Sequence, residues 1–196
     1  VGVDLNARAI DVARFNARLN GLAAEFHAGD LTAPVRGERF DLLVSQPGFV
    51  ARPDDDDGAS YLYGGRVGDE LALRVLAEVP AALAPGGRAC VFFIAPVREG
   101  VKVADRLHDA FADAPCDLAI LRSEAPSPTL QAMAFAAHGS EALDARYVAR
   151  VERYVRHFDR VGVREVDGLL AVVRRHAAHD ERVGGRYAVA LPLRET

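Results

Sequence analysis

The sequence lacks any long hydrophobic run. Its apolar stretches stay far below the roughly 20 residues that a membrane-spanning helix needs, and no basic segment followed by an apolar one opens the chain. We therefore expect a soluble, cytoplasmic protein that neither crosses nor binds a membrane.

Cysteine is also scarce, with only Cys90 and Cys116 in 196 residues. Both lie in or beside segments that read as strands, and they lack the spacing of metal ligands, so we expect buried thiols and no disulfide. His176 and His179 are spaced to share a metal, but no third ligand is apparent, which favours a surface pair. The sequence thus predicts no metal site.

The chain contains a single lysine, Lys102, and every other basic side chain apart from histidine is arginine. We interpret this bias as composition and not as recognition. Hydrophobic residues make up 50% of the chain and the net charge is −4. These values suit one domain with a core shielded by helices. No internal repeat or low-complexity linker interrupts it.

Strand-like and helix-like segments alternate along the chain. Strands are expected at residues 1–5, 25–28, 40–44, 88–94, 117–121, 169–173 and 187–191. Helices are expected at 6–20, 68–83 and 101–112, with further helical segments up to 161; a turn is expected at 84–87 and a proline-rich loop at 123–128. This alternation predicts an α/β fold with a doubly wound, mostly parallel sheet.

Three of the expected strands end in polar residues. The ends are Asp4-Leu5-Asn6, Gly29-Asp30-Leu31 and Gln46-Pro47-Gly48-Phe49. In an open parallel sheet such ends line one edge, where ligands bind. A carboxylate at the first end can accept hydrogen bonds from both ribose hydroxyls, which indicates a nucleotide-like cofactor. The dinucleotide-binding fold also has an acidic residue after its second strand. That fold does not require Gln46-Pro47-Gly48-Phe49, which we call the tetrad.

These motifs resemble those of class I S-adenosylmethionine-dependent methyltransferases. The helix segment at 13–21 and the turn Leu83-Ala84-Pro85-Gly86-Gly87 share the resemblance. The nearest group is the small-domain type, including release-factor glutamine and ribosomal RNA guanine methyltransferases, whose fourth strand ends in Asn-Pro-Pro followed by Tyr or Phe. Here Gln46-Pro47-Gly48-Phe49 occupies that place.

The resemblance covers residues 1–95 well and 117–174 more loosely. It implies a Rossmann-like methyltransferase fold that lacks its first strand and glycine loop, so we expect a partial domain that is weakly stable in isolation. Residues 1–95 would carry the cofactor and acceptor motifs, and residues 96–196 would form the C-terminal half, with a helical insertion at about 129–161.

The resemblance also implies a role for each motif residue. Asp4 would bind the ribose hydroxyls of S-adenosylmethionine, Leu5 would pack on the adenine, and Asn6 would be a further cofactor-binding residue. Asp30 would accept a hydrogen bond from the adenine amino group, while Leu31 packs on the ring.

The tetrad would carry the chemistry, with Gln46, Pro47 and Phe49 as its catalytic residues and Gln46 also beside the cofactor. A side-chain amide oxygen and a backbone carbonyl would accept the two hydrogens of the target nitrogen, and the aromatic ring would stack on its plane. Such positioning can supply several kcal/mol of the barrier. Gln46 has one methylene more than asparagine, and Gly48 is expected to loosen the loop.

The resemblance favours methyl transfer to a nitrogen of a protein side chain or a small molecule. An RNA methyltransferase is one alternative, and a non-catalytic cofactor- or partner-binding protein is another. The acidic segment 52–58 opposes a polyanion, which favours the first interpretation and is not typical of a metal site. Residues 61–65 suit either a substrate lid or an ordinary loop.

A helix expected at 141–161 has an apolar face and a basic face. The apolar face holds Leu143, Tyr147, Val151, Tyr154, Val155 and Phe158, and the basic face holds Arg146, Arg150, Arg153, Arg156 and Arg160. The basic face fits solvent best, with RNA or an acidic protein as the alternative. The sequence does not indicate an oligomeric state.

Overall fold

The computed structural model describes residues 1–54, 60–110, 115–124, 126–138, 140, 142–177 and 191–192. The chain divides into two compact units, Val1–Phe40 and Asp41–Thr196. No helix in the described ranges has the length and apolar character to cross a membrane.

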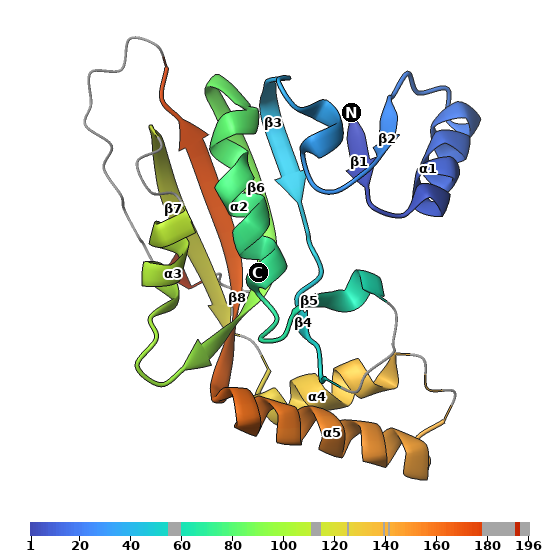
Figure 1. Cartoon of the computed structure of the whole chain (residues 1–196), viewed down its shortest axis with the longest axis vertical. Helices are drawn as coiled ribbons and strands as arrows, with labels where there is room; N and C mark the ends of the chain where they lie inside the picture. Colours follow the sequence, from blue (N-terminus) through green and yellow to red (C-terminus); the bar gives the residue numbers. More distant parts are fainter. Residues whose placement is uncertain are drawn as a thin grey trace. The chain divides into compact units, whose positions relative to one another are not determined.

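The first unit contains the short parallel strands β1 (Gly2–Asp4) and β2 (Phe26–Ala28) and the helix α1 (Ala7–Leu19) (Figure 1). A 3-10 turn (Ala33–Val35) follows β2. The Asn6 side chain caps α1 by accepting a hydrogen bond from the Arg8 amide at 3.0 Å. After the helix, Gly21 adopts a left-handed conformation with φ of 65°. The helix predicted between Asn6 and Asn20 is confirmed.

The second unit is built on a five-stranded sheet with the order β3-β6-β8-β7-β9 (Figure 1). Its strands are β3 (Phe40–Ser45), β4 (Val50–Ala51), β5 (Tyr63–Gly65), β6 (Leu83–Arg98), β7 (Cys116–Glu124), β8 (Val163–Arg175) and β9 (Leu191–Pro192). Its helices are α2 (Glu70–Ala82), α3 (Val103–Ala110), α4 (Pro128–Ala137) and α5 (Ala145–Val161), with a 3-10 turn at Ser60–Leu62. β4 and β5 form a separate two-stranded pair.

The α/β architecture is as predicted, but the sheet is mixed. β8 pairs antiparallel with both β6 and β7, so β6 and β7 run parallel to each other on either side of it. The predicted turn at 84–87 belongs to the start of β6, where Gly86 has φ of 79° and the ladder with β8 begins only at Arg88. Sequence alone did not reveal the inserted antiparallel strand, because a buried strand has the same apolar pattern in either direction.

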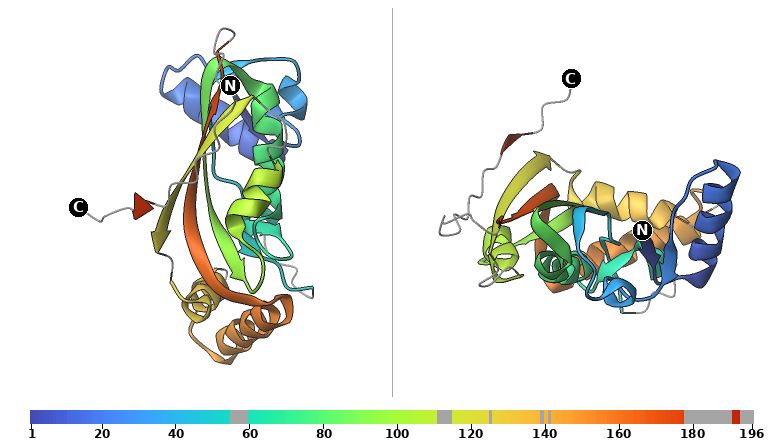
Figure 2. Two further views of the ribbon diagram at one scale, coloured as in Figure 1. Left: turned by 90° about the vertical axis from the view of Figure 1, so that its left-hand side faces the viewer. Right: turned by 90° about the horizontal axis from the view of Figure 1, so that it is seen from above.

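Helices α2 and α3 cover one face of this sheet (Figure 2). Leu76 and Val79 of α2 and Leu107 of α3 are fully buried against Val91 and Phe93 of β6. The β6 residues alternate between buried and accessible because successive side chains of a strand point to opposite faces. This cluster is the main core of the second unit.

Helices α4 and α5 lie between β7 and β8 in the chain. They pack on each other and on β8 around a second core that contains Phe135, Tyr154 and Phe158. Two details differ from the expected helix faces. Leu143 precedes the helix and is 80% exposed, whereas His157 is buried.

Both cysteines are free, and Cys116 is buried in β7, where desolvation raises the pKa of its thiol. The Nε2 atom of His176 lies 3.0 Å from a carboxylate oxygen of Asp117, and the His176 side chain is 10% exposed. His179, residues 55–58 of the acidic segment and 187–190 of the last expected strand lie outside the described residues. Within the described ranges no group of three or more His, Cys, Asp or Glu residues could hold a metal ion.

Candidate functional site

The ends of β1 and β2 lie side by side in the first unit. The strands are parallel, with Asp4 opposite Ala28, and the Gly29 amide donates to the Asp4 carbonyl at 3.0 Å. The motif that follows β1 and the motif that follows β2 are therefore neighbours. A side chain at Gly29 would collide with Pro34, because a Cβ there would lie 2.3 Å from the proline Cγ.

Asp4 and Leu5 present the groups that an adenosine would need. Asp4 is exposed; one carboxylate oxygen accepts from the Asn6 amide at 2.7 Å, and no contact within the described ranges uses the other oxygen. The Leu5 side chain is 75% exposed beside it. The Asn6 side chain is occupied in capping α1. Asp4 and Leu5 are therefore accessible for the ribose and adenine contacts that the resemblance implies.

Leu31 adopts a backbone conformation that is unfavourable for its residue type. Its φ is 48°, and no other non-glycine residue in the described part of the chain has a positive φ. Such a conformation costs about 1 to 3 kcal/mol and is typical of ligand-binding positions. Asp30, which precedes it, is exposed. The sequence did not predict this strained backbone. The strain is consistent with the ligand role that the resemblance implies for Asp30 and Leu31.

In the second unit the acceptor loop, Gln46–Phe49, leaves the end of β3 directly after Ser45. Gln46 is exposed, and its amide has no hydrogen-bond partner among the described residues, whereas Pro47, Gly48 and Phe49 are partly buried. The loop thus offers one free amide side chain on a partly buried backbone. This arrangement suits a group that binds an incoming ligand.

Gly48 is required for close backbone packing and does not loosen the loop as expected. A Cβ at this position would lie 2.7 Å from the Tyr63 carbonyl oxygen and 2.9 Å from that of Tyr61. Real Cβ atoms do not approach backbone oxygens so closely. The residue that replaces the second proline of the family pattern therefore lets two backbones touch.

Gly48→Ala is expected to displace the acceptor loop, because the added methyl meets rigid backbone atoms. Overpacking of this kind costs about 1 to 3 kcal/mol of stability. The methyl transfer that the sequence resemblance implies should slow by more than the loss of folded protein explains. Urea unfolding and a turnover assay measure the two effects. Gly100→Ala is the control, since its φ of 71° carries backbone strain but its Cβ meets nothing within 4 Å. Equal turnover in both variants would contradict this account.

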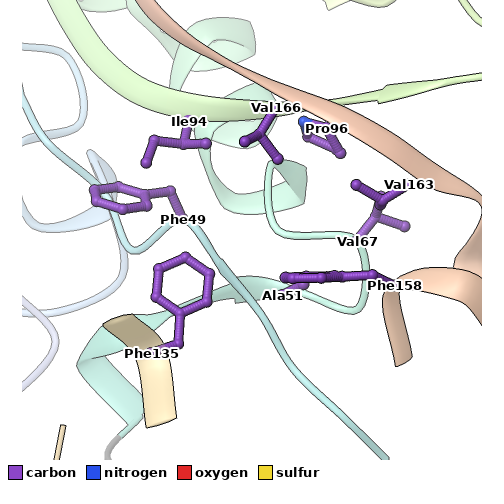
Figure 3. Close-up of a pocket in the computed structure, with 9 residues that line it drawn as sticks. All are labelled: Phe49, Ala51, Val67, Ile94, Pro96, Phe135, Phe158, Val163 and Val166. Atoms are coloured by element: carbon purple, nitrogen blue, oxygen red, sulfur yellow. The ribbon is translucent and has the colours of Figure 1, made fainter. Parts of the chain in front are cut away.

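The ring of Phe49 forms one wall of a small apolar cavity (Figure 3). The cavity has a free volume of about 10 Å³ and is lined by Phe49, Ala51, Val67, Ile94, Pro96, Phe135, Phe158, Val163 and Val166. A space of this size holds at most one water, and its apolar lining offers no partners to hold one. Phe49 also contacts Phe92 edge-on, at 6.5 Å between ring centroids. The insertion helices thus help to fix the aromatic residue of the tetrad.

Residues 61–65, for which the sequence allows a lid or an ordinary loop, are mostly held by strand pairing and burial. Tyr63–Gly65 is strand β5, which pairs in parallel with β4, and Tyr63 is buried under Arg52, whose guanidinium lies 5.2 Å from its ring centroid. Only Tyr61 is strongly exposed.

The basic face of α5 is partly neutralised. Arg156 pairs with Glu152 one turn away, and Arg160 pairs with Asp54 at 3.1 Å. Arg150 donates to the Ser140 hydroxyl. These contacts favour the solvated-face interpretation over a grip on phosphates.

The chain matches the profile of the methyltransferase small domain family over residues 1–113, which is more than half of its length. It belongs to this family. Over 94 residues it is 39% identical to the release factor glutamine methyltransferase of Deinococcus radiodurans, covering 43% of this chain and 33% of the relative. Over 99 residues it is 33% identical to the ribosomal protein uL3 glutamine methyltransferase of Bradyrhizobium diazoefficiens, covering 45% and 31%.

Among solved structures, the [4+2]-cyclase SpnF shares the fold with a TM-score of 0.52 and 17% identity, covering 90% of this chain and 66% of that one. A likeness at this identity concerns the Rossmann-like fold alone. The chain spans less than half the length of these and other curated relatives that it matches.

Proposed function

We propose that the protein transfers a methyl group from S-adenosylmethionine to a side-chain amide nitrogen of a protein, with glutamine as the first candidate. The observation that carries this proposal is the family match across both ligand motifs, combined with an exposed, unpartnered amide at the end of β3. Relatives that align with this region are named for glutamine methylation of a release factor and of a ribosomal protein.

In this proposal Asp4, Leu5, Asp30 and Leu31 bind the adenosine, and the acceptor loop binds the substrate nitrogen. S-adenosylmethionine supplies an electrophilic methyl group on its sulfonium. The Gln46 amide oxygen and the Pro47 carbonyl accept the two hydrogens of the target amide, which aims the nitrogen lone pair.

The partly buried Phe49 ring stacks on the plane of that amide. A planar amide is a poor nucleophile, so positioning is the main contribution that these residues make.

The test is S-adenosylhomocysteine formation by the protein with three acceptors offered separately: glutamine-containing proteins or peptides, small-molecule amides, and RNA. Product with the glutamine acceptors supports the proposal, and product only with RNA or only with small molecules overturns the acceptor class. Cofactor binding without transfer to any acceptor would support a non-catalytic protein.

Asp4→Ala is expected to weaken S-adenosylmethionine binding by about 1 to 3 kcal/mol, which is the cost of leaving a ribose hydroxyl without its charged acceptor. Calorimetric titration measures the effect. Asp11→Ala serves as the control, because Asp11 is an exposed carboxylate of α1 that pairs with Arg14 at 3.6 Å. An affinity unchanged by Asp4→Ala would refute the ribose role.

A further inference from the structure

The acceptor loop rests on a second segment, Tyr63–Gly68, which we name the bracing segment. It contains three glycines, and at two of them its backbone closely approaches that of the acceptor loop. A Cβ on Gly64 would lie 2.5 Å from the Gly48 carbonyl oxygen, and one on Gly68 would lie 2.8 Å from the Phe49 carbonyl oxygen. The position of the acceptor loop therefore depends on the conformation of the bracing segment.

The bracing segment cannot hold its shape by steric restriction alone. Gly65 and Gly68 have φ of 122° and 114°, a region that glycine enters freely but that also gives glycine many alternatives. Some other group must select the observed conformation. Among the described residues, contacts from β4, α2 and α5 contribute to this selection.

Glu70, in the first turn of α2, provides the most specific of these contacts. One of its carboxylate oxygens accepts from the Val67 amide at 2.8 Å and the other accepts from the Gly68 amide at 2.9 Å. The same side chain fills the space beneath Gly65, where a Cβ would lie 2.4 Å from a carboxylate oxygen. A charged acceptor shared by two successive amides is a strong, directional restraint.

The other two contacts hold neighbouring residues. The Arg52 amide donates to the Gly65 carbonyl at 2.8 Å, which extends the pairing of β4 with β5. From α5, the buried His157 contacts the Arg66 carbonyl through Nε2 at 2.7 Å. A carbonyl only accepts, so Nε2 carries the hydrogen. These contacts leave the two amides at Val67 and Gly68 to Glu70.

We propose that Glu70 is a positioning residue for methyl transfer, which fixes Gln46–Phe49 by clamping the bracing segment. This inference rests on the proposed function for the reaction it serves. Glu70 itself does not contact the substrate. Loss of its second acceptor oxygen would free the Val67–Gly68 backbone, and a displacement of about 1 Å in the acceptor loop would cost about a hundredfold in rate.

The experiment compares Glu70→Gln with the wild-type protein. Glutamine keeps the size of the side chain but turns one acceptor into a donor that faces an amide N–H. We expect kcat to fall about 10- to 100-fold, with KM for the acceptor and the dissociation constant for S-adenosylmethionine changed less than about threefold. Hydrogen exchange should also speed up at Val67 and Gly68 and at backbone amides of the acceptor loop.

Two controls separate positioning from general destabilisation. Val173→Ala removes buried methyl groups from β8, so it lowers stability while leaving the bracing segment intact. Glu152→Gln removes an exposed carboxylate that pairs with Arg156. Both should keep kcat near the wild-type value.

Faster exchange in Glu70→Gln with unchanged kcat would overturn the positioning role, and unchanged exchange would overturn the clamp itself. If the wild-type protein transfers no methyl group, the proposed function fails, and positioning for transfer fails with it; exchange then separately reports whether Glu70 clamps the loop.

Discussion

Gln46→Ala should lower methyl transfer by at least about a hundredfold while leaving the affinity for S-adenosylmethionine nearly unchanged. Truncation removes the amide oxygen proposed to orient the target nitrogen, and orientation errors of about 1 Å carry a rate penalty of this size. Because Gln46 is exposed and has no hydrogen-bond partner among the described residues, the change should cost little stability. Single-turnover rates and calorimetry measure the two quantities.

The matched control is Asn20→Ala, which removes another exposed amide, at the end of α1. It should leave turnover unchanged. A Gln46→Ala variant that lost cofactor affinity and turnover together would show that the residue supports the fold and not the acceptor.

Arg106→Met should lower the free energy of unfolding by about 3 to 5 kcal/mol, because it leaves the buried Asp69 carboxylate without its partner. Asp69 is 1% exposed at the start of α2, and its carboxylate oxygen lies 2.5 Å from the Arg106 guanidinium on α3. The ion pair therefore joins the two helices that cover the sheet. Urea unfolding at pH 7 measures the loss.

The loss of unfolding free energy caused by Arg106→Met should become smaller as the pH falls. Burial raises the pKa of Asp69 above its usual 3.8 by more than the hydrogen bond and charge of Arg106 lower it. A folded-state pKa above the unfolded value means that the stability contribution is present at low pH and lost as the pH rises through the folded value. Without Arg106 the pKa of Asp69 rises further. In the variant, Asp69 therefore becomes neutral at a higher pH, and the cost of burying its charge disappears there.

A second substitution provides the control for the ion pair. Asp69→Asn added to Arg106→Met removes the uncompensated charge, and it should recover part of the lost stability at pH 7. Failure of the double variant to recover any stability would attribute the loss to packing of the arginine side chain.

The sequence predicted helix α1 closely and the ends of β1 and β3 to within one residue. These features depend on local signals: an Asn cap, a C-terminal glycine and short apolar runs ending in polar residues. The family match agrees with the methyltransferase motifs that were recognised in those same runs. The direction of β8 was not predictable, because strand pairing joins residues far apart in the chain.

Gly48 shows the same difference between local sequence signals and tertiary contacts. From the sequence it was a flexible substitute for proline, yet the backbones of Tyr61 and Tyr63 leave it no room for a side chain. Glu70 gave no signal at all, since an acidic residue in the first helical turn is commonplace. Its importance became visible only from the two amides that it binds.

The sequence by itself determined the α/β class and the family, because both depend on patterns of residues close together in the chain. Only the tertiary structure decided how the acceptor loop is held, through contacts that α2 and α5 make with the bracing segment. Such contacts form when the core packs elements that are distant in the chain against each other. Close packing then leaves no room for a side chain at Gly48, and burial strengthens the hydrogen bonds that hold the loop.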